Sequence, residues 1–317
     1  MKYGITLDRE GIAARPAPLA YLSDFARQAE RMGCSYAVIG DRLESGVDPF
    51  LMLTAIAEAS GQMQLVTSVV ILPPRGVLVT AKQFAALDVL SGGRVVAGVG
   101  TGSLYRDYEL VGLSAEEMRP RFDESVQAMR AYLDPTGPDF IGRFYDTRGV
   151  KLKPSPVQQP GLPIWIGSWG SPIGLRRVAR LADGWLSSAG PGHQTPEQFA
   201  KDVALLNTLL VAEGKDPVTF PNAVSTMALF VSEDPAELAE YGGPGYVPRP
   251  VGVGVQQPAG RPADDPHAHD MVGTRAACIE KVRRWQAAGA NALFLVPRGP
   301  DPLGQMRYFL DEVAARA

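Results

Sequence analysis

The stretch PIWIGSWGSPIGLRRVARLADGW, residues 163–185, contains the unit from which the fold is predicted. An apolar run from Pro163 to Ile166 leads into a turn of glycine and serine, and helical periodicity then extends from Ile173 to Leu181. A second apolar run begins at Gly184. Because strands joined by a helical crossover run parallel, the stretch predicts a strand–helix–strand unit of a parallel sheet.

The same unit recurs along the chain. Apolar runs of strand length alternate with stretches whose apolar residues have helical spacing. The predicted strands are Tyr3–Leu7, Tyr36–Gly40, Gln64–Leu72, Arg94–Gly100, Pro163–Ile166, Gly184–Ser187, Ala223–Phe230 and Ala292–Val296. Eight such units in 317 residues predict an α/β fold, a single (β/α)8 TIM barrel with insertions over residues 1–317. An open doubly wound sheet is the alternative that the pattern leaves.

Two segments interrupt the alternation. Residues 134–160 are predicted to form a small insertion with a β-hairpin. Residues 232–272 are rich in proline and glycine and follow a strand end, where barrel active sites lie. We expect this second segment to be a loop that acts as a lid, and a passive linker is the simpler alternative.

The composition restricts partners and compartment. A net charge of −3 predicts no broad basic surface and therefore no nucleic-acid partner. The sequence lacks a signal-peptide core and any apolar run of membrane-spanning length, which predicts a cytoplasmic protein with no membrane partner. Two cysteines, Cys34 and Cys278, are too few for a disulfide framework. A small-molecule substrate is the expected partner.

Residues just after the strands are the candidates for the site, because these loops form the working face of a barrel. Asp8, Arg9 and Glu10 follow the first strand. The candidates for substrate contact are Arg42, Tyr105, His193 and Arg298. No spacing of histidine, cysteine or carboxylate predicts a metal site, and no residue is identified as a catalytic acid, base or nucleophile.

The turn after the fifth predicted strand consists of Gly167, Ser168, Trp169, Gly170 and Ser171. Its glycines let backbone N–H groups approach a ligand, and its serines add hydroxyl donors. The helix that follows would direct its positive N-terminal end at the turn. These features leave a phosphate socket and a plain tight corner equally open, and an indole in the turn favours a pocket wall.

Three motifs bear a resemblance to a known family. AERMGCSYAVIGD (29–41), VTSVVILPPRGVLVTAKQFAALDVLSGGRVVAGVGTGS (66–103) and PSPVQQPGLPIWIGSWGSPIGLRRVARLADGW (154–185) resemble the bacterial luciferase-like flavin and deazaflavin oxidoreductases. The resemblance covers most of the chain, and residues 232–272 match least. It implies a (β/α)8 barrel with insertions, FMN or a deazaflavin (coenzyme F-420) in the barrel mouth, and a homodimer.

The resemblance also implies where the cofactor binds. A cis peptide at Ser68–Val69 would lie behind the ring system, and the loop containing Thr101 and Gly102 would meet the ring edge or ribityl chain. Asp41 would belong to the same site. The turn from Gly167 to Ser171 would take the phosphate, which favours the socket.

Two departures from the family bear on the reaction. Deazaflavin-dependent alcohol and sugar-phosphate enzymes have a histidine where this chain has Arg42, and the sugar-phosphate enzymes have an acidic residue in place of Ser103. We therefore predict a monooxygenase that uses reduced FMN and dioxygen on a small organic substrate, with a separate flavin reductase as a possible partner. The alternatives are a deazaflavin-dependent reductase or dehydrogenase, for which Arg176, Arg177 and Arg180 would offer a basic groove, and a non-catalytic flavin-binding barrel.

Overall fold

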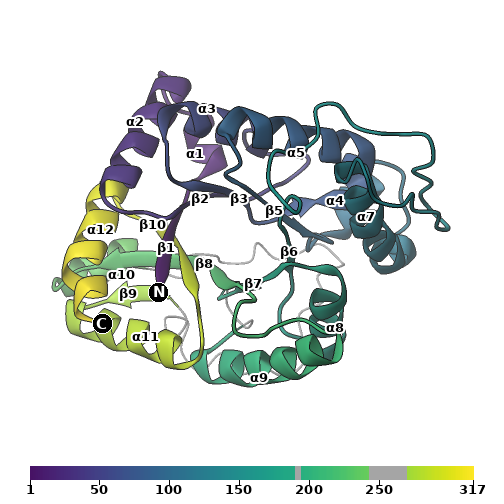
Figure 1. Cartoon of the computed structure of the whole chain (residues 1–317). Helices are drawn as coiled ribbons and strands as arrows, with labels where there is room; N and C mark the ends of the chain where they lie inside the picture. Colours follow the sequence, from purple (N-terminus) through teal and green to yellow (C-terminus); the bar gives the residue numbers. More distant parts are fainter. Residues whose placement is uncertain (190–193, 243–269) are drawn as a thin grey trace.

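The computed structural model describes residues 1–189, 194–242 and 270–317 (Figure 1). Within these ranges, eight parallel strands close into a barrel in the order β1, β2, β3, β5, β6, β7, β8, β10. Their bounds are Lys2–Thr6, Tyr36–Ile39, Gln64–Thr67, Val95–Gly100, Ile164–Gly167, Gly184–Ser188, Asn222–Val231 and Ala292–Pro297. Because β10 pairs with both β1 and β8, the sheet has no open edge there. The predicted TIM barrel is confirmed and the open doubly wound sheet is wrong.

Helices surround the barrel, as Figure 1 shows. Their bounds are α1 Arg9–Ala13, α2 Pro18–Arg31, α3 Pro49–Ala59, α4 Leu72–Arg75, α5 Val77–Ser91, α6 Tyr105–Glu109, α7 Met118–Leu133, α8 Pro172–Leu181, α9 Pro196–Ala212, α10 Pro235–Tyr241, α11 Arg275–Ala287 and α12 Pro302–Tyr308. Several begin with proline after a capping side chain, as at Asp48, Ser171 and Thr195. Proline fits there because the first helical N–H has no intrahelical acceptor.

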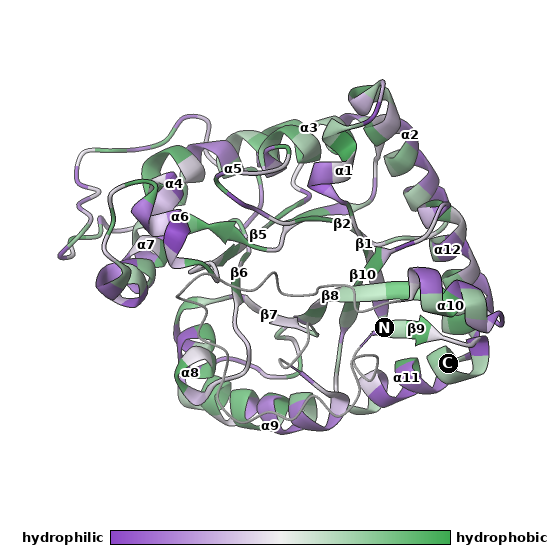
Figure 2. Ribbon diagram, turned by 180° about the vertical axis from the view of Figure 1, so that it is seen from behind, coloured by the Kyte–Doolittle hydropathy of each residue, from purple (hydrophilic) through white to green (hydrophobic). Residues whose placement is uncertain are grey.

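The apolar side chains form two separate layers. Outward-facing strand residues pack against the apolar faces of the helices. Each of these helices carries both hydrophobic and hydrophilic residues, as the colours of Figure 2 show. Inward-facing residues fill the barrel, with Tyr36, Trp165 and Phe294 at its amino-terminal end. Their rings touch, since the centroids of Tyr36 and Phe294 are 5.2 Å apart. This aromatic layer closes one end of the barrel.

Glycines on neighbouring strands make room for the aromatic layer. A Cβ atom at Gly184 would lie 2.5 Å from Nε1 of Trp165, and one at Gly4 would lie 2.7 Å from Cδ1 of Phe294. Large and small residues thus alternate between adjacent strands, which lets the aromatic rings fit inside the barrel.

The third strand of the barrel is interrupted by one extra residue. Leu65 pairs with Val95, whereas Val70 in β4 (Val70–Ile71) pairs with Val99, so the offset falls from 30 residues to 29. The Ser68–Val69 peptide between the two pieces is cis, as the family resemblance implied. Across this change of register, Val69 packs against the interior cluster and Val70 lies in the outer core.

The two predicted interruptions are described to different extents. Residues 134–160 form an excursion with one antiparallel bridge, Ile141 to Asp146, which is a minimal form of the expected hairpin. In the second segment, α10 and β9 (Met271–Gly273) form the two ends, and β9 pairs with β8. Residues 243–269 lie outside the described residues, so the lid stays a prediction. No helix among the described residues is long and apolar enough to cross a membrane.

Replacing Gly184 by alanine tests the aromatic layer. We expect Gly184→Ala to lower the free energy of unfolding by about 1–3 kcal/mol, because the new methyl group displaces the Trp165 ring from a close-packed interior. Gly61→Ala is the matched control, since no atom lies within 4 Å of a Cβ there, and it should change stability by less than about 0.5 kcal/mol. Urea denaturation measures both, and equal effects would contradict this account.

Candidate functional site at the barrel mouth

The carboxyl ends of the strands surround a bowl of small residues. Alternation along the strands turns these residues toward the barrel interior, beyond the cluster that contains the aromatic layer. They are Thr6, Gly40, Ser68, Gly100, Gly167, Ser188 and Ser225, and Val296 of β10 is the exception. The opposite end of the barrel holds three aromatic rings. The interior is therefore filled at one end and left shallow and open at the other.

A pocket of about 160 Å³ lies on one side of this bowl. Its lining comes from the ends of β1, β2 and β3, from the first half of β8 and from the start of α1: Thr6, Leu7, Asp8, Arg9, Val38, Gly40, Ser68 and Ser225. The Thr6 hydroxyl is buried and has no hydrogen-bond partner among the described residues. A buried polar atom without a partner is costly, which makes this hydroxyl a candidate contact for a bound molecule.

Val69 rises from the floor of the bowl between two glycines. A Cβ at Gly100 would lie 2.6 Å from Cγ2 of Val69, and one at Gly167 would lie 2.9 Å from Cγ1. The backbone on both sides of Val69 is therefore bare. A flat ring system resting on Val69 meets no side chain from these two strands, so the residues present fit a tricyclic cofactor.

The loop after β5 is held against β4. Gly102 has a φ of +75°, and a Cβ there would lie 2.9 Å from Cγ2 of Ile71. The Thr101 hydroxyl donates to the Gly102 carbonyl over 3.1 Å. These contacts place Thr101 and Gly102 beside the bowl, where the family resemblance expects the cofactor ring.

The turn after β6 has the geometry of a helix cap. Ser171 is the N-cap of α8 and its Oγ accepts the Gly174 N–H over 3.2 Å. The Ser168 Oγ accepts the Gly170 N–H over 3.4 Å, and its carbonyl accepts from Nε1 of Trp185 over 2.9 Å. Each hydroxyl keeps its own O–H for a ligand. Trp169 is half-buried.

Side chains from α9 and from the residues just before it hold this turn in place. Asp202 is buried and accepts from Gln194 and Gln198, both over 2.7 Å. Gln194 also donates to the Trp169 carbonyl over 3.3 Å. Gly170 has a φ of +83°, and a Cβ there would lie 1.9 Å from the Asp202 carboxylate. A substitution at Gly170 therefore breaks this support, and it does not test phosphate binding alone.

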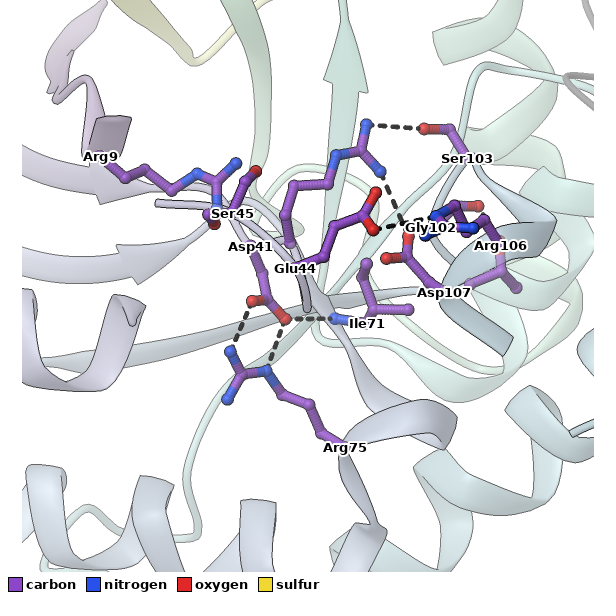
Figure 3. A network of polar contacts seen from close by, with 12 residues as sticks. Arg9, Asp41, Glu44, Ser45, Ile71, Arg75, Gly102, Ser103, Arg106 and Asp107 are labelled. Carbon is purple, nitrogen blue, oxygen red and sulfur yellow. Dashed lines mark hydrogen bonds and ion pairs between the residues drawn. The ribbon is translucent and has the colours of Figure 1, made fainter. Parts of the chain in front are cut away.

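Asp41 faces the helices and not the bowl. Ala37 and Ile39 of the same strand lie in the outer core, and alternation gives Asp41 the same direction. Its carboxylate accepts two hydrogen bonds from Arg75, both of 2.6 Å, and one of 3.1 Å from the Ile71 N–H (Figure 3). Asp41 thus joins the end of β2 to β4 and α4. Its contact with a cofactor stays a prediction.

Arg42 joins the loops after β2 and β5. Its guanidinium donates to Oγ of Ser103 over 3.1 Å and to Asp107 over 3.4 Å. Burial raises the pKa of the Asp107 carboxyl, and the Arg42 charge partly opposes this shift. Arg106 and Glu44 pair across the same two loops at 2.9 Å (Figure 3). Arg42 and Ser103, the two positions where this chain departs from the deazaflavin enzymes, are therefore in contact.

The remaining candidates for substrate contact are Tyr105, Arg298 and His193. Tyr105 begins α6 and is half-buried. Arg298 follows β10; burial lowers the pKa of its guanidinium, and the charge of Asp270 opposes the shift. His193 lies outside the described residues. Among the residues that the structure describes, no group of three histidine, cysteine or carboxylate side chains is arranged to hold a metal ion.

Sequence reasoning missed Thr6, Arg75 and Asp202. The signal for Asp202 was its position: it lies three residues after Phe199 and four before Leu206, on the buried stripe of α9. A carboxylate at a core position needs a polar partner, and here the partners are the glutamines beside the turn. Arg75 carried no comparable signal, because its partners come from separate loops.

A closed parallel barrel that is open at the carboxyl ends of its strands is the architecture of a (β/α)8 barrel enzyme, whose active site lies at that end. The model of the luciferase-like monooxygenase family matches residues 1–292, and the chain belongs to this family of oxidoreductases.

Individual relatives share part of the sequence. An uncharacterised protein of Mycobacterium tuberculosis is 32% identical over 53% of this chain, and the alignment spans only 56% of that protein. A coenzyme F-420-dependent glucose-6-phosphate dehydrogenase of Mycolicibacterium gilvum is 30% identical over 68% of this chain and 65% of its own length. The fold is also that of a monooxygenase from Streptomyces bottropensis, with a TM-score of 0.81, 22% identity and 99% coverage of both chains.

The Asp41–Arg75 pair yields a stability prediction. Arg75→Gln should lower the free energy of unfolding by about 3 kcal/mol, because it leaves the fully buried Asp41 carboxylate without its counter-charge. Arg27→Gln removes an exposed ion pair with Asp24 and should cost less than about 1 kcal/mol. Chemical denaturation at neutral pH compares the two. If Arg75→Gln were as stable as the control, Asp41 would not be the link between β2 and β4.

Proposed function

We propose that the protein is a monooxygenase that uses reduced FMN and dioxygen to oxidise a small organic substrate. The observation that carries the proposal is the bare bowl around Val69, flanked by Gly100 and Gly167. Family membership supports it. A separate flavin reductase would supply the reduced cofactor.

The bound flavin supplies the electrons that activate dioxygen. The chain's own residues position the ring and protect it. Val69 would support the ring, and Gly100 and Gly167 would let the backbone come close to it. The turn from Ser168 to Ser171 would offer its hydroxyl groups and the start of α8 to the phosphate. The aromatic layer at the amino-terminal end of the barrel would limit the access of water from that side.

The charges near the turn favour FMN over the deazaflavin coenzyme. Arg177 and Arg180 both pair with Asp123, the latter at 3.0 Å. Arg176 of the predicted basic groove is exposed and has no such pair with any residue that the structure describes. An anionic glutamyl tail therefore meets one arginine in place of three. FMN has no tail and needs no such groove.

The phosphate socket is tested by Ile173→Glu. Ile173 is 63% exposed in the first turn of α8, where a carboxylate is compatible with the helix dipole but repels a phosphate. We expect roughly fivefold weaker FMN binding, about 1 kcal/mol, and unchanged binding of riboflavin, which has no phosphate. Ile173→Gln is the neutral control and should bind both as the wild type does. Equal losses of affinity for FMN and riboflavin would show that the turn does not bind the phosphate.

Titration of the wild-type protein distinguishes the cofactors. Fluorescence titration with FMN and with coenzyme F-420, each oxidised and reduced, should show tighter binding of FMN. Tight binding of the deazaflavin with no binding of reduced FMN would favour the dehydrogenase alternative, which the Mycolicibacterium relative supports. Cofactor binding without turnover of any acceptor would favour a non-catalytic flavin-binding barrel.

We also propose that the protein forms a homodimer through α3 and α5, which lie side by side in Figure 1. Leu51, Val79 and Leu90 of these helices are 69%, 60% and 69% exposed. Several large apolar side chains on one surface indicate a contact with another molecule.

The dimer proposal is tested by Leu90→Glu. Sedimentation velocity should find a dimer for the wild type and a monomer for this variant, because a charge in the contact cannot be desolvated without a partner. Val218 is 92% exposed and lies outside these helices, so Val218→Glu should leave the dimer intact. A monomeric wild type at all concentrations would contradict the proposal.

A further inference from the structure

We infer that the substrate carries an oxyanion, a carboxylate or a phosphate, and that Arg9 binds it in the pocket beside the cofactor bowl. The inference rests on the proposed function, because it names the class of molecule that the same site accepts. Arg9 is the first residue of α1 and lines the pocket with Thr6 and Ser68.

Arg9 is half-buried, and its guanidinium has one neutral hydrogen-bond partner among the described residues. Its Nη1 donates to the Ser45 carbonyl over 2.7 Å. No carboxylate among the described residues lies within ion-pair distance of it. A guanidinium has five N–H donors, so most of them are available to a molecule in the pocket.

The charges around Arg9 are engaged elsewhere. Asp41 binds Arg75, and the Asp8 carboxylate accepts the Glu10 N–H at the start of α1. Glu10 is exposed and accepts from the Ser45 hydroxyl. Burial lowers the pKa of Arg9, as does the positive charge of Arg42, although the nearby carboxylates oppose both. An oxyanion in the pocket would relieve this unfavourable environment.

The loop after β2 is shaped around Arg9. Gly46 has a φ of +75°, and a Cβ there would lie 3.0 Å from both Cβ and Nη1 of Arg9. The Val47 N–H donates to the Arg9 carbonyl over 3.2 Å. The side chain therefore has a defined direction. The simpler interpretation is that Arg9 only fastens this loop, and the test must separate the two roles.

The Thr6 hydroxyl is the second feature that indicates a ligand. It is buried, unpaired among the described residues and part of the same pocket. Thr6 and Arg9 both line this small cavity, and a hydroxyl and a guanidinium together suit an anion with several acceptor oxygens. Other arginines of the mouth fit less well, since Arg42 already binds Ser103 and Asp107, Arg106 pairs with Glu44, and Arg298 does not line the pocket.

The test uses benzoate, phenyl phosphate and the neutral analogue benzamide as probes. Calorimetric titration of the wild type, with and without FMN, should show that at least one anion binds at least tenfold more tightly than benzamide. The preferred anion identifies the group as carboxylate or phosphate. If neither anion binds more tightly than benzamide, the inference is overturned, whatever FMN does.

Variants of Arg9 distinguish a role in anion binding from a role in holding the loop after β2. Arg9→Gln should weaken the preferred anion at least tenfold and leave the affinities for benzamide and FMN unchanged, and Arg9→Lys should restore part of the loss. Arg27→Gln on α2 should change none of these affinities. Arg9→Gln with wild-type anion affinity, or with equal losses for anion, benzamide and FMN, would show that Arg9 only holds the loop. Failure of FMN to bind, with anion binding intact, would instead contradict the cofactor proposal alone.

Discussion

The extra residue between β3 and β4 sets the geometry of the barrel mouth. It turns Val69 into the bowl and returns Val70 to the outer core within one step along the chain. The hydrogen bond from the Ile71 N–H to Asp41 holds the strand at its new register, and Arg75 secures the Asp41 carboxylate. A buried ion pair outside the barrel thereby fixes a surface inside it, and each glycine around Val69 follows from that register.

Much of the fold was predictable, because it follows from local patterns. Strand and helix periodicity identified the eight units, and a closed barrel was the arrangement that best fitted their number and the chain length. The amphipathic patterns did not reveal α10 and β9, because short elements in a proline- and glycine-rich segment have weak periodicity. The register shift was not derivable from periodicity either; only the family resemblance pointed to that position.

The candidate site was predictable only in part. Placing residues after strands predicted that the turn at Ser168 to Ser171 and the loop at Thr101 and Gly102 lie at the carboxyl ends of the strands, and the structure places them there. It did not show which side of a strand each residue takes at its end, so the direction of the Asp41 side chain toward the helices was not foreseen. The contact of Arg42 with Ser103 spans 61 residues of sequence, and only the closed sheet brings the two together. Long-range polar pairs of this kind leave no periodic signal.

The aromatic layer of Tyr36, Trp165 and Phe294 has a kinetic meaning. Because these rings fill the barrel at its base, the bowl and its pocket open toward the carboxyl ends of the strands in the part of the chain that the structure describes. Two molecules that occupied the bowl and its pocket together would then share this entrance. The molecule that lies deeper would enter first and leave last, so the architecture would impose an order of binding and release.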